Sequence, residues 1–108
     1  MTALRLIFAG LLLAIGAAPS WAQGYPSRPV RVVVGFPPGQ TGDISARLLG
    51  QWLSDKLGQP FVIENRPGAS AMTGTDLVAK AEPDGHTIGI SLGGALAINT
   101  LLFAKMPY

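Results

Sequence analysis

A run of branched residues that ends in a loop rich in proline and glycine constrains the fold of this chain more than any other stretch. Residues 32–43 read Val-Val-Val-Gly-Phe-Pro-Pro-Gly-Gln-Thr-Gly-Asp. Three valines without an alternating polar side are typical of a strand that is buried on both faces, and a helical pattern begins at Asp43. The prolines stiffen the loop, while Gly39 and Gly42 let the backbone turn or approach a ligand closely. The stretch therefore predicts a strand, a tight loop and a helix N-terminus whose N–H groups suit an anion.

Strand and helix patterns alternate along the rest of the chain. Strands are expected at residues 30–36, 61–63 and 87–91, and helices from Asp43 to a C-cap at Gly58, after the loop 69–73, and at 95–103. Strands that alternate with helices at this spacing pair in parallel through right-handed crossovers. The sequence thus predicts one α/β domain of three βα units, with a parallel sheet in the order 2-1-3.

The first two predicted helices carry patterns that indicate which side packs on the sheet. The first has an apolar arc of Ile44, Leu48, Leu49, Trp52, Leu53 and Leu57, opposite Arg47, Gln51, Ser54 and Asp55. We expect this arc to pack on the sheet, with Trp52 in the core. The second helix is expected to face the sheet with Leu77, Val78 and Ala81. Its Asp76 and Lys80 are spaced to form an ion pair on the solvent side.

The strand order also predicts where a ligand would lie. In parallel sheets of this kind, ligands bind beyond the carboxyl ends of the strands, at the point where the order reverses. That point falls between the first and second strands, so the loops 36–43 and 66–74 should lie side by side. Each loop ends in a helix N-terminus, whose N–H groups and dipole favour a carboxylate. The candidate binding residues are Phe36, Pro38, Gly39, Gln40, Thr41, Asp43, Gly68, Ala69, Ser70 and Ala71.

The first 22 residues have the pattern of a secretory signal. Arg5 precedes an apolar core at residues 6–18, and residues 19–22 place small side chains at the two positions that a signal peptidase reads. The apolar run is shorter than the roughly 20 residues that span a bilayer. The prediction is a cleaved signal at residues 1–22 and export of residues 23–108 to the periplasm. The alternative is an uncleaved N-terminal anchor.

Composition excludes several classes of protein. The formal net charge is +2 and 13% of the residues are charged, so the chain offers no basic field for nucleic acid and no polybasic membrane patch. The absence of cysteine excludes disulfides, thiolate catalysis and cysteine metal sites, and a lone His86 argues against a histidine metal site. No nucleophile and base can be assembled from the remaining residues. Neither catalysis, a metal nor a cofactor is therefore predicted.

Several motifs, in order, resemble those of a known family. They are residues 25–39 (Tyr-Pro-Ser-Arg-Pro-Val-Arg-Val-Val-Val-Gly-Phe-Pro-Pro-Gly), Asp43, residues 64–69 (Glu-Asn-Arg-Pro-Gly-Ala) and residues 83–85 (Pro-Asp-Gly). With these motifs the chain resembles the substrate-binding component of tripartite tricarboxylate transporters, the Bug proteins. The resemblance implies a periplasmic, two-lobed, non-enzymatic protein that binds a small carboxylate and delivers it to a membrane permease.

The resemblance also bears on single residues. The family's Asp that matches Asp43 helps to order water beside the bound carboxylate, whereas the residue pattern alone favours an N-cap or first-turn role. Gln40, Ser70 and Ala71 stand where the family commonly has glycine, and their side chains narrow the space in which backbone can touch a ligand. Ser70 either donates its hydroxyl to a ligand or is an exposed loop serine.

Two further side chains have alternative roles. Arg66 either binds a ligand carboxylate in a bidentate fork or braces the turn beside Pro67, and the bracing role is favoured. His86 follows a predicted turn at a position where the family often has an aromatic residue, which favours packing over chemistry.

Family members are much longer than this chain. The resemblance therefore implies that residues 23–108 are a truncated N-terminal part, half of the first lobe of a two-lobed fold like that of periplasmic binding proteins. The tail at residues 101–108 supports this, because Lys105 is its only charged side chain and a finished terminus is normally more polar. Two alternatives remain open: a gene fragment without a transport role, and a small α/β enzyme that binds phosphate with residues 35–43. No Gly-Lys-Ser/Thr follows that loop, which argues against the enzyme.

Overall fold

The computed structural model describes residues 24–108. The elements are β1 (Val30–Val34), α2 (Thr41–Leu57), β2 (Phe61–Asn65), α3 (Met72–Ala79), β3 (Thr87–Ile90), the π-helical turn η1 (Gly94–Ile98) and α4 (Asn99–Leu102). The predicted signal at residues 1–22 lies outside the described residues. None of the helices within residues 24–108 combines the length and hydrophobicity that a bilayer crossing requires.

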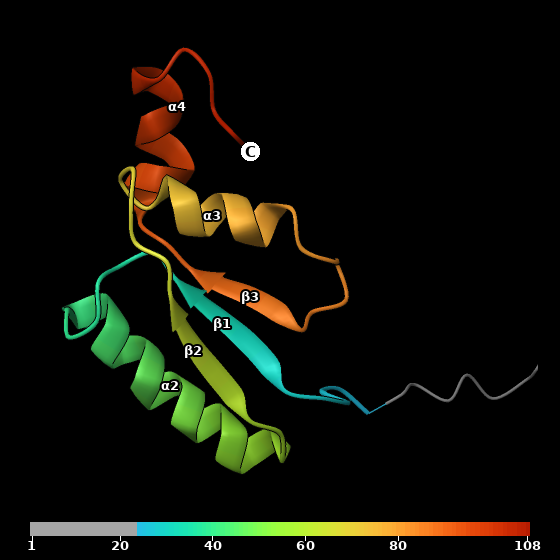
Figure 1. Ribbon diagram of the computed structural model, residues 1–108. Helices are drawn as coiled ribbons and strands as arrows, with labels where there is room; N and C mark the ends of the chain where they lie inside the picture. Colours follow the sequence, from blue (N-terminus) through green and yellow to red (C-terminus); the bar gives the residue numbers. More distant parts are fainter. Residues whose placement is uncertain (1–23) are drawn as a thin grey trace, which may run out of the picture.

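The three strands form one parallel sheet in the order β2-β1-β3, with β1 in the middle (Figure 1). Val30 at the start of β1 lies opposite Phe61 at the start of β2. Because β1 has a strand on each side and a helix over each face, its four valines are buried. β1 ends at Val34 rather than at Phe36, since the chain bends at Gly35. The predicted α/β class, parallel pairing and strand order are confirmed.

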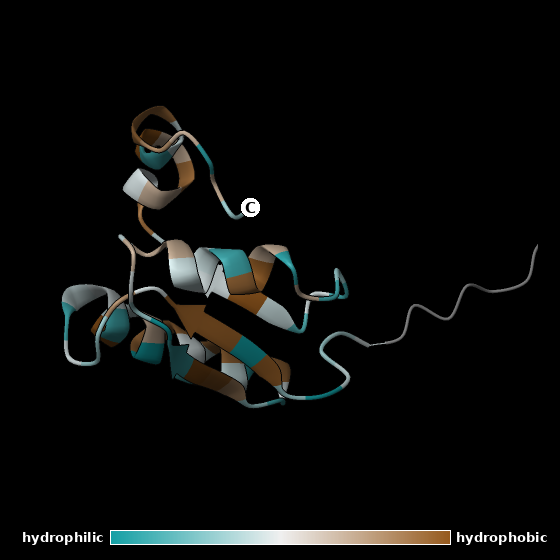
Figure 2. Cartoon of the chain, turned by 45° about the horizontal axis from the view of Figure 1, so that its top comes forward, coloured by the Kyte–Doolittle hydropathy of each residue, from teal (hydrophilic) through white to brown (hydrophobic). Residues whose placement is uncertain are grey.

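Helices α2 and α3 cover opposite faces of the sheet, and Figure 2 shows hydrophobic residues along the strands between them. On the α2 side, one buried cluster comprises Val30, Val32, Val34, Ala46 and Phe61. On the α3 side, a Cβ added to Gly74 would lie 3.5 Å from Cγ1 of Val33. Each fully buried valine contributes about 1.5–3 kcal/mol. The largest fully buried side chains are valines, so the core is small.

Most of the apolar arc of α2 does not face the sheet, although Leu53 packs against the buried cluster. The buried residues of this helix are Asp43, Ala46 and Gly50. Trp52 is 57% exposed, with Lys56 Nζ 5.9 Å from its ring centroid. The prediction that Trp52 lies in the core is therefore wrong, and the prediction that the arc packs on the sheet holds for Leu53 but is wrong for the five residues of the arc that are exposed. The reason is the close approach of the helix, because a Cβ added to Gly50 would lie 3.0 Å from Cδ1 of Ile63. Only small residues fit in that contact.

The local signals at the ends of the first two helices are confirmed. Gly58 has φ 74° and donates its N–H to Ser54 O at 3.0 Å, as a C-cap glycine does. Lys80 at the C-cap of α3 places its Nζ 2.6 Å from Asp76 Oδ1, which confirms the predicted ion pair, although the Asp76 side chain is half-buried rather than on the solvent side. The three apolar residues expected on the sheet side of α3, Leu77, Val78 and Ala81, are half-buried.

The last helical segment differs in shape from the prediction. A single helix was expected at residues 95–103, whereas the chain forms η1 followed by a single α-helical turn, α4 (Figure 1). Leu101 is 87% exposed, and Leu102 and Phe103 are also exposed. Tyr108 reaches back to donate its hydroxyl to Ala95 O at 2.5 Å. In η1 and α4, one side, which includes Ala95 and Asn99, is therefore buried against the protein, and the other side is exposed.

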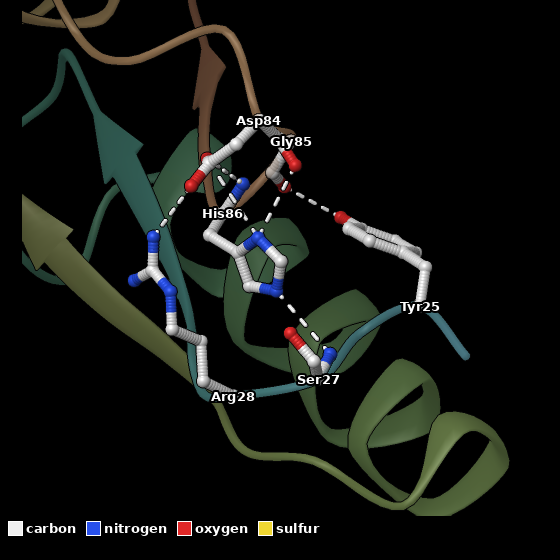
Figure 3. Close-up of polar contacts among 6 residues, drawn as sticks. All are labelled: Tyr25, Ser27, Arg28, Asp84, Gly85 and His86. Atoms are coloured by element: carbon white, nitrogen blue, oxygen red, sulfur yellow. Dashed lines mark hydrogen bonds and ion pairs between the residues drawn. The ribbon is translucent and has the colours of Figure 1, made fainter. Parts of the chain in front are cut away.

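A polar cluster joins the N-terminal segment to the turn before β3 (Figure 3). Tyr25 donates its hydroxyl to Gly85 O at 2.5 Å, and Arg28 pairs with Asp84 at 2.6 Å. The buried His86 packs edge-on against Tyr25, with ring centroids 5.2 Å apart. The packing role favoured for His86 agrees with this position.

Candidate functional site

The β1–α2 and β2–α3 loops meet at the carboxyl edge of the sheet, as predicted from the strand order. Arg66 donates its N–H to Val34 O at 2.8 Å, which fixes the base of the second loop on β1. Asn65 Nδ2 donates to Phe36 O at 3.0 Å, which ties the first loop to the end of β2. A Cβ added to Gly35 would lie 2.8 Å from Cβ of Ala71. The two loops therefore touch, and the N-termini of α2 and α3 follow them.

The first loop exposes most of its candidate residues. Pro38, Gly39, Gln40 and Thr41 are exposed, while Phe36 is half-buried against the core. Gly39 has φ 87°, a conformation that favours glycine. The loop thus presents backbone and polar side chains to solvent directly before α2. Their role in binding a ligand stays a prediction.

Asp43 points into the protein. It is 2% exposed, and its Oδ2 accepts hydrogen bonds from Arg47 Nε at 3.0 Å and from the Gly39 N–H at 2.9 Å. Its Oδ1 accepts one from Asn65 Nδ2 at 2.8 Å. The Arg47 guanidinium first, then the Gly39 and Asn65 donors, lower the pKa of Asp43 to about 2. The carboxylate therefore stays ionised, with its charge balanced from within the protein.

Of the two structural roles expected for Asp43, the first-turn role is confirmed and the N-cap role is wrong. The helix begins at Thr41, and its N-cap is the extended residue Gln40, which makes no side-chain capping bond. Asp43 lies in the first turn and reaches back to the loop, where a negative charge also complements the helix dipole.

The second loop adopts a left-handed backbone over four residues. Gly68, Ala69, Ser70 and Ala71 have φ values of 131°, 46°, 55° and 67°. For a residue with a side chain this conformation costs roughly 1–2 kcal/mol. Gly68, Ala69 and Ser70 are exposed, while Ala71 is buried beside Gly35. The backbone at Ser70 and Ala71 therefore has a conformation that favours glycine, and the family that this sequence resembles commonly has glycine at these two positions.

Replacing Ser70 by glycine is expected to stabilise the protein by about 1 kcal/mol, because glycine adopts a positive φ without strain. Ser70 is exposed, so little packing is lost. Urea unfolding followed by circular dichroism measures the change. Ser45→Gly is the matched control: Ser45 is also exposed but lies inside α2, so glycine there should destabilise. A destabilised Ser70→Gly protein would contradict the strain argument.

Two residues of the site were not predicted. Arg47 was placed on the solvent side of its helix, and Asn65 was not among the candidates. Both contact Asp43, and Arg47 Nη2 also donates to Asn65 Oδ1 at 3.1 Å. One sequence signal could have identified Asn65: it is a polar amide residue at the carboxyl end of β2, opposite the buried Val34. In parallel sheets of this kind, ligands bind beyond the carboxyl ends of the strands.

The favoured bracing role of Arg66 agrees with the structure. Its Nε donates to Glu64 Oε1 at 2.5 Å, and Glu64 also pairs with Arg31 on β1. Arg31 first, and Arg66 after it, lower the pKa of Glu64 to about 2. These pairs link the two strands beside the site.

Groups suited to metal binding are not assembled in the described part of the chain. Between residues 24 and 108, no three His, Asp or Glu side chains lie close enough to hold a metal ion. Ser27, His86 and Asp84 lie together, but His86 Nε2 accepts the backbone N–H of Ser27 at 3.3 Å. A catalytic serine would donate its hydroxyl to that nitrogen instead. A cavity of about 330 Å³ between α3, β3 and η1 has mainly apolar walls and is lined by none of the candidate binding residues of the two loops.

Comparison with known proteins identifies the family. Residues 45–108 match the model of the tripartite tricarboxylate transporter family receptor. Protein BugT of Bordetella pertussis is 46% identical over 93 residues, which are 85% of this chain and 28% of BugT. A UPF0065 protein of a Pseudomonas species is 41% identical over 96% of this chain and 32% of its own length. The chain thus spans about a third or less of the length of these relatives.

Solved structures give the same result. MatC from Rhodopseudomonas palustris, with bound malate, matches with a TM-score of 0.72 and 40% identity, over 78% of this chain and 29% of MatC. Another R. palustris protein, with adipate, matches with a TM-score of 0.74 and 43% identity, over 78% of this chain and 28% of its own. The family consists of receptors rather than enzymes. Sequence motifs, fold and family match agree, and the chain belongs to the tripartite tricarboxylate transporter receptor family.

Proposed function

We propose that this chain is the N-terminal part of an extracytoplasmic solute receptor that holds one carboxylate group of a small organic acid between residues 36–41 and 68–71. The observation that carries the proposal is the contact of two loops, each followed directly by a helix N-terminus. Helix N-termini present a positive dipole end, and N–H groups that are not already bonded, to an anion. At α3 the N–H groups of Met72 and Thr73 already donate to Ala69 O and Gly68 O, so this helix contributes mainly through its dipole. The malate and adipate bound by solved relatives support a carboxylate as the ligand.

The placement of charge supports the same ligand class. Asp43 is buried and paired with Arg47, so its negative charge is balanced and turned away from the exposed side of the loop. The side chains of Gln40, Thr41 and Ser70 are exposed around the helix starts and can donate hydrogen bonds. An acid bound there would meet N–H and O–H donors. In the complete receptor, a second lobe closes over the ligand and a membrane permease receives it.

We further propose that the chain is exported to the periplasm and cleaved after Ala22. The pattern of residues 1–22 supports this, because a short apolar core precedes a small-x-small site. The intact mass of material from the periplasm of an expressing bacterium is expected to equal that of a chain starting at Gln23. A dominant species that retains residues 1–22 would contradict the proposal.

The binding proposal is tested in a chimera in which residues 24–108 replace the matching segment of MatC. Calorimetry with malate, adipate and a panel of other di- and tricarboxylates is expected to find a ligand with about micromolar affinity. Residues 23–108 alone should bind no better than about millimolar, since water competes for an open site. In the chimera, Gly39→Leu should abolish binding, because Gly39 has a positive φ and lies in the binding loop.

Asp55→Ala is the control in the chimera, since Asp55 is exposed on α2 away from both loops. It should leave the affinity unchanged. A chimera that folds, by circular dichroism, but binds none of the acids would overturn the proposed function.

A further inference from the structure

Three side chains at the site form a closed triangle of hydrogen bonds. Asp43 and Arg47 lie one turn apart on α2, and Asn65 is the last residue of β2. Arg47 Nε donates to Asp43 Oδ2 at 3.0 Å, and Arg47 Nη2 donates to Asn65 Oδ1 at 3.1 Å. Asn65 Nδ2 closes the triangle by donating to Asp43 Oδ1 at 2.8 Å. Each member therefore orients the other two.

The triangle also holds the first loop at two points. Asn65 Nδ2 donates to Phe36 O at 3.0 Å, and Asp43 Oδ2 accepts the N–H of Gly39 at 2.9 Å. Between these points lie Pro37 and Pro38, which have no backbone N–H. The loop has few backbone donors of its own, so the side chains of the triangle supply the hydrogen bonds that fix its path.

Asn65 has a second connection that its two partners lack. The next residue, Arg66, donates its N–H to Val34 O at 2.8 Å and begins the second loop. The side chain of Asn65 thus holds the first loop while its backbone leads directly into the second. Both donor hydrogens of its amide are used, and its oxygen accepts from Arg47.

We propose that Asn65 is the positioning residue that sets the spacing of the two carboxylate-binding loops, with Arg47 as its orienting partner. The inference rests on the proposed function of these loops. An aspartate at this position has nearly the same shape but lacks both donor hydrogens and places a second carboxylate beside Asp43. Asn65→Asp therefore separates hydrogen bonding from packing.

The experiment uses the whole chain and nuclear magnetic resonance of backbone amides, with malate as the probe. In the wild type, malate is expected to shift amide resonances of residues 36–41 and 68–71. In Asn65→Asp, the Gly39 amide should exchange with solvent about tenfold faster and the affinity for malate should fall about tenfold, because a charge-assisted hydrogen-bond network is lost. The amide of Val33 in β1 should keep its protection, which shows that the sheet remains intact.

Gln51→Glu is the matched control. Gln51 Nε2 donates to Asp55 Oδ1 at 3.1 Å, so this change also puts a carboxylate beside an aspartate, but on the exposed side of α2. It should leave both the Gly39 exchange rate and the malate affinity unchanged. Arg47→Gln is the second variant if Asn65→Asp does not fold, since Arg47 is exposed and its loss should also speed exchange at Gly39.

The possible results separate the two proposals. If malate at millimolar concentrations shifts no loop resonance in the wild type, the Gly39 exchange rates alone decide the positioning role, and the carboxylate function fails only if the chimera also binds none of the acids. If Asn65→Asp, or Arg47→Gln in its place, keeps the Gly39 exchange rate and the malate affinity within about twofold of wild type, the positioning role is overturned.

Discussion

Replacing Gly35 by valine is expected to destabilise the protein by about 2–3 kcal/mol or more, a large part of the stability of a small domain. Gly35 lies where β1 turns into the first loop. A Cβ there would lie 2.8 Å from Cβ and 3.4 Å from Cα of Ala71, and one of these contacts is with backbone. Neither neighbour can rotate away. Urea unfolding followed by circular dichroism measures the loss.

A compensating pair tests the cause of this loss. Gly35→Ala alone should destabilise by about 1–3 kcal/mol, whereas Gly35→Ala combined with Ala71→Gly should recover a large part of it. The second change removes the clashing methyl group and relieves the positive φ of Ala71. Gly93→Ala is the control, since Gly93 has φ −54° and an added Cβ would meet nothing within 4 Å. If the changes in the free energy of unfolding for Gly35→Ala and Ala71→Gly simply add in the double variant, the proposed clash between residues 35 and 71 is contradicted.

Acidification of the wild-type protein from about pH 5 to pH 2 is also expected to cause a large loss of stability. Asp43 and Glu64 have pKa values of about 2 in the folded protein, against ordinary values of 3.8 and 4.5. The pKa of Asp84 is also lowered, first by the backbone N–H of His86. In this window the unfolded chain binds more protons than the folded one. Stability is therefore complete above the ordinary values and falls as the pH approaches 2.

The urea midpoint measured at several pH values checks this expectation. Glu64→Gln should lower the midpoint at neutral pH and flatten its decline in acid, because the pair with Arg31 no longer titrates. Asp55→Gln, at an exposed site on α2, should leave the decline as it is in the wild type. A midpoint that rises between pH 5 and pH 2 would have the wrong sign for depressed carboxylate pKa values.

The topology of this chain was predictable because its signals are local. The valine run, the glycine and proline boundaries and the alternation of strands with helices each act within a few residues. The orientation of α2 was not predictable in this way. The hydrophobic pattern predicts that large side chains such as Leu48 and Trp52 face the sheet. The helix packs so closely on the sheet that the small residues Ala46 and Gly50 occupy the contact instead.

The site was predictable only as far as topology determines it. Strand order placed the two loops together. It could not reveal that Arg47 and Asn65 meet at Asp43, because that contact depends on the approach of α2 to the end of β2. The left-handed backbone at Ala69 and Ser70 was likewise hidden, since residues with a Cβ normally indicate the opposite conformation.

The central position of β1 has a consequence for the folding of the nascent chain. Among the strands of residues 24–108, β1 is synthesised before both of its partners: β2 follows α2, and β3 follows α3. Until they arrive, an aliphatic segment with high β-propensity has two unpaired edges, which is the kind of segment that associates with other chains. A chaperone that shields unfolded chains should therefore bind residues 30–34 first and release them once β2 has paired.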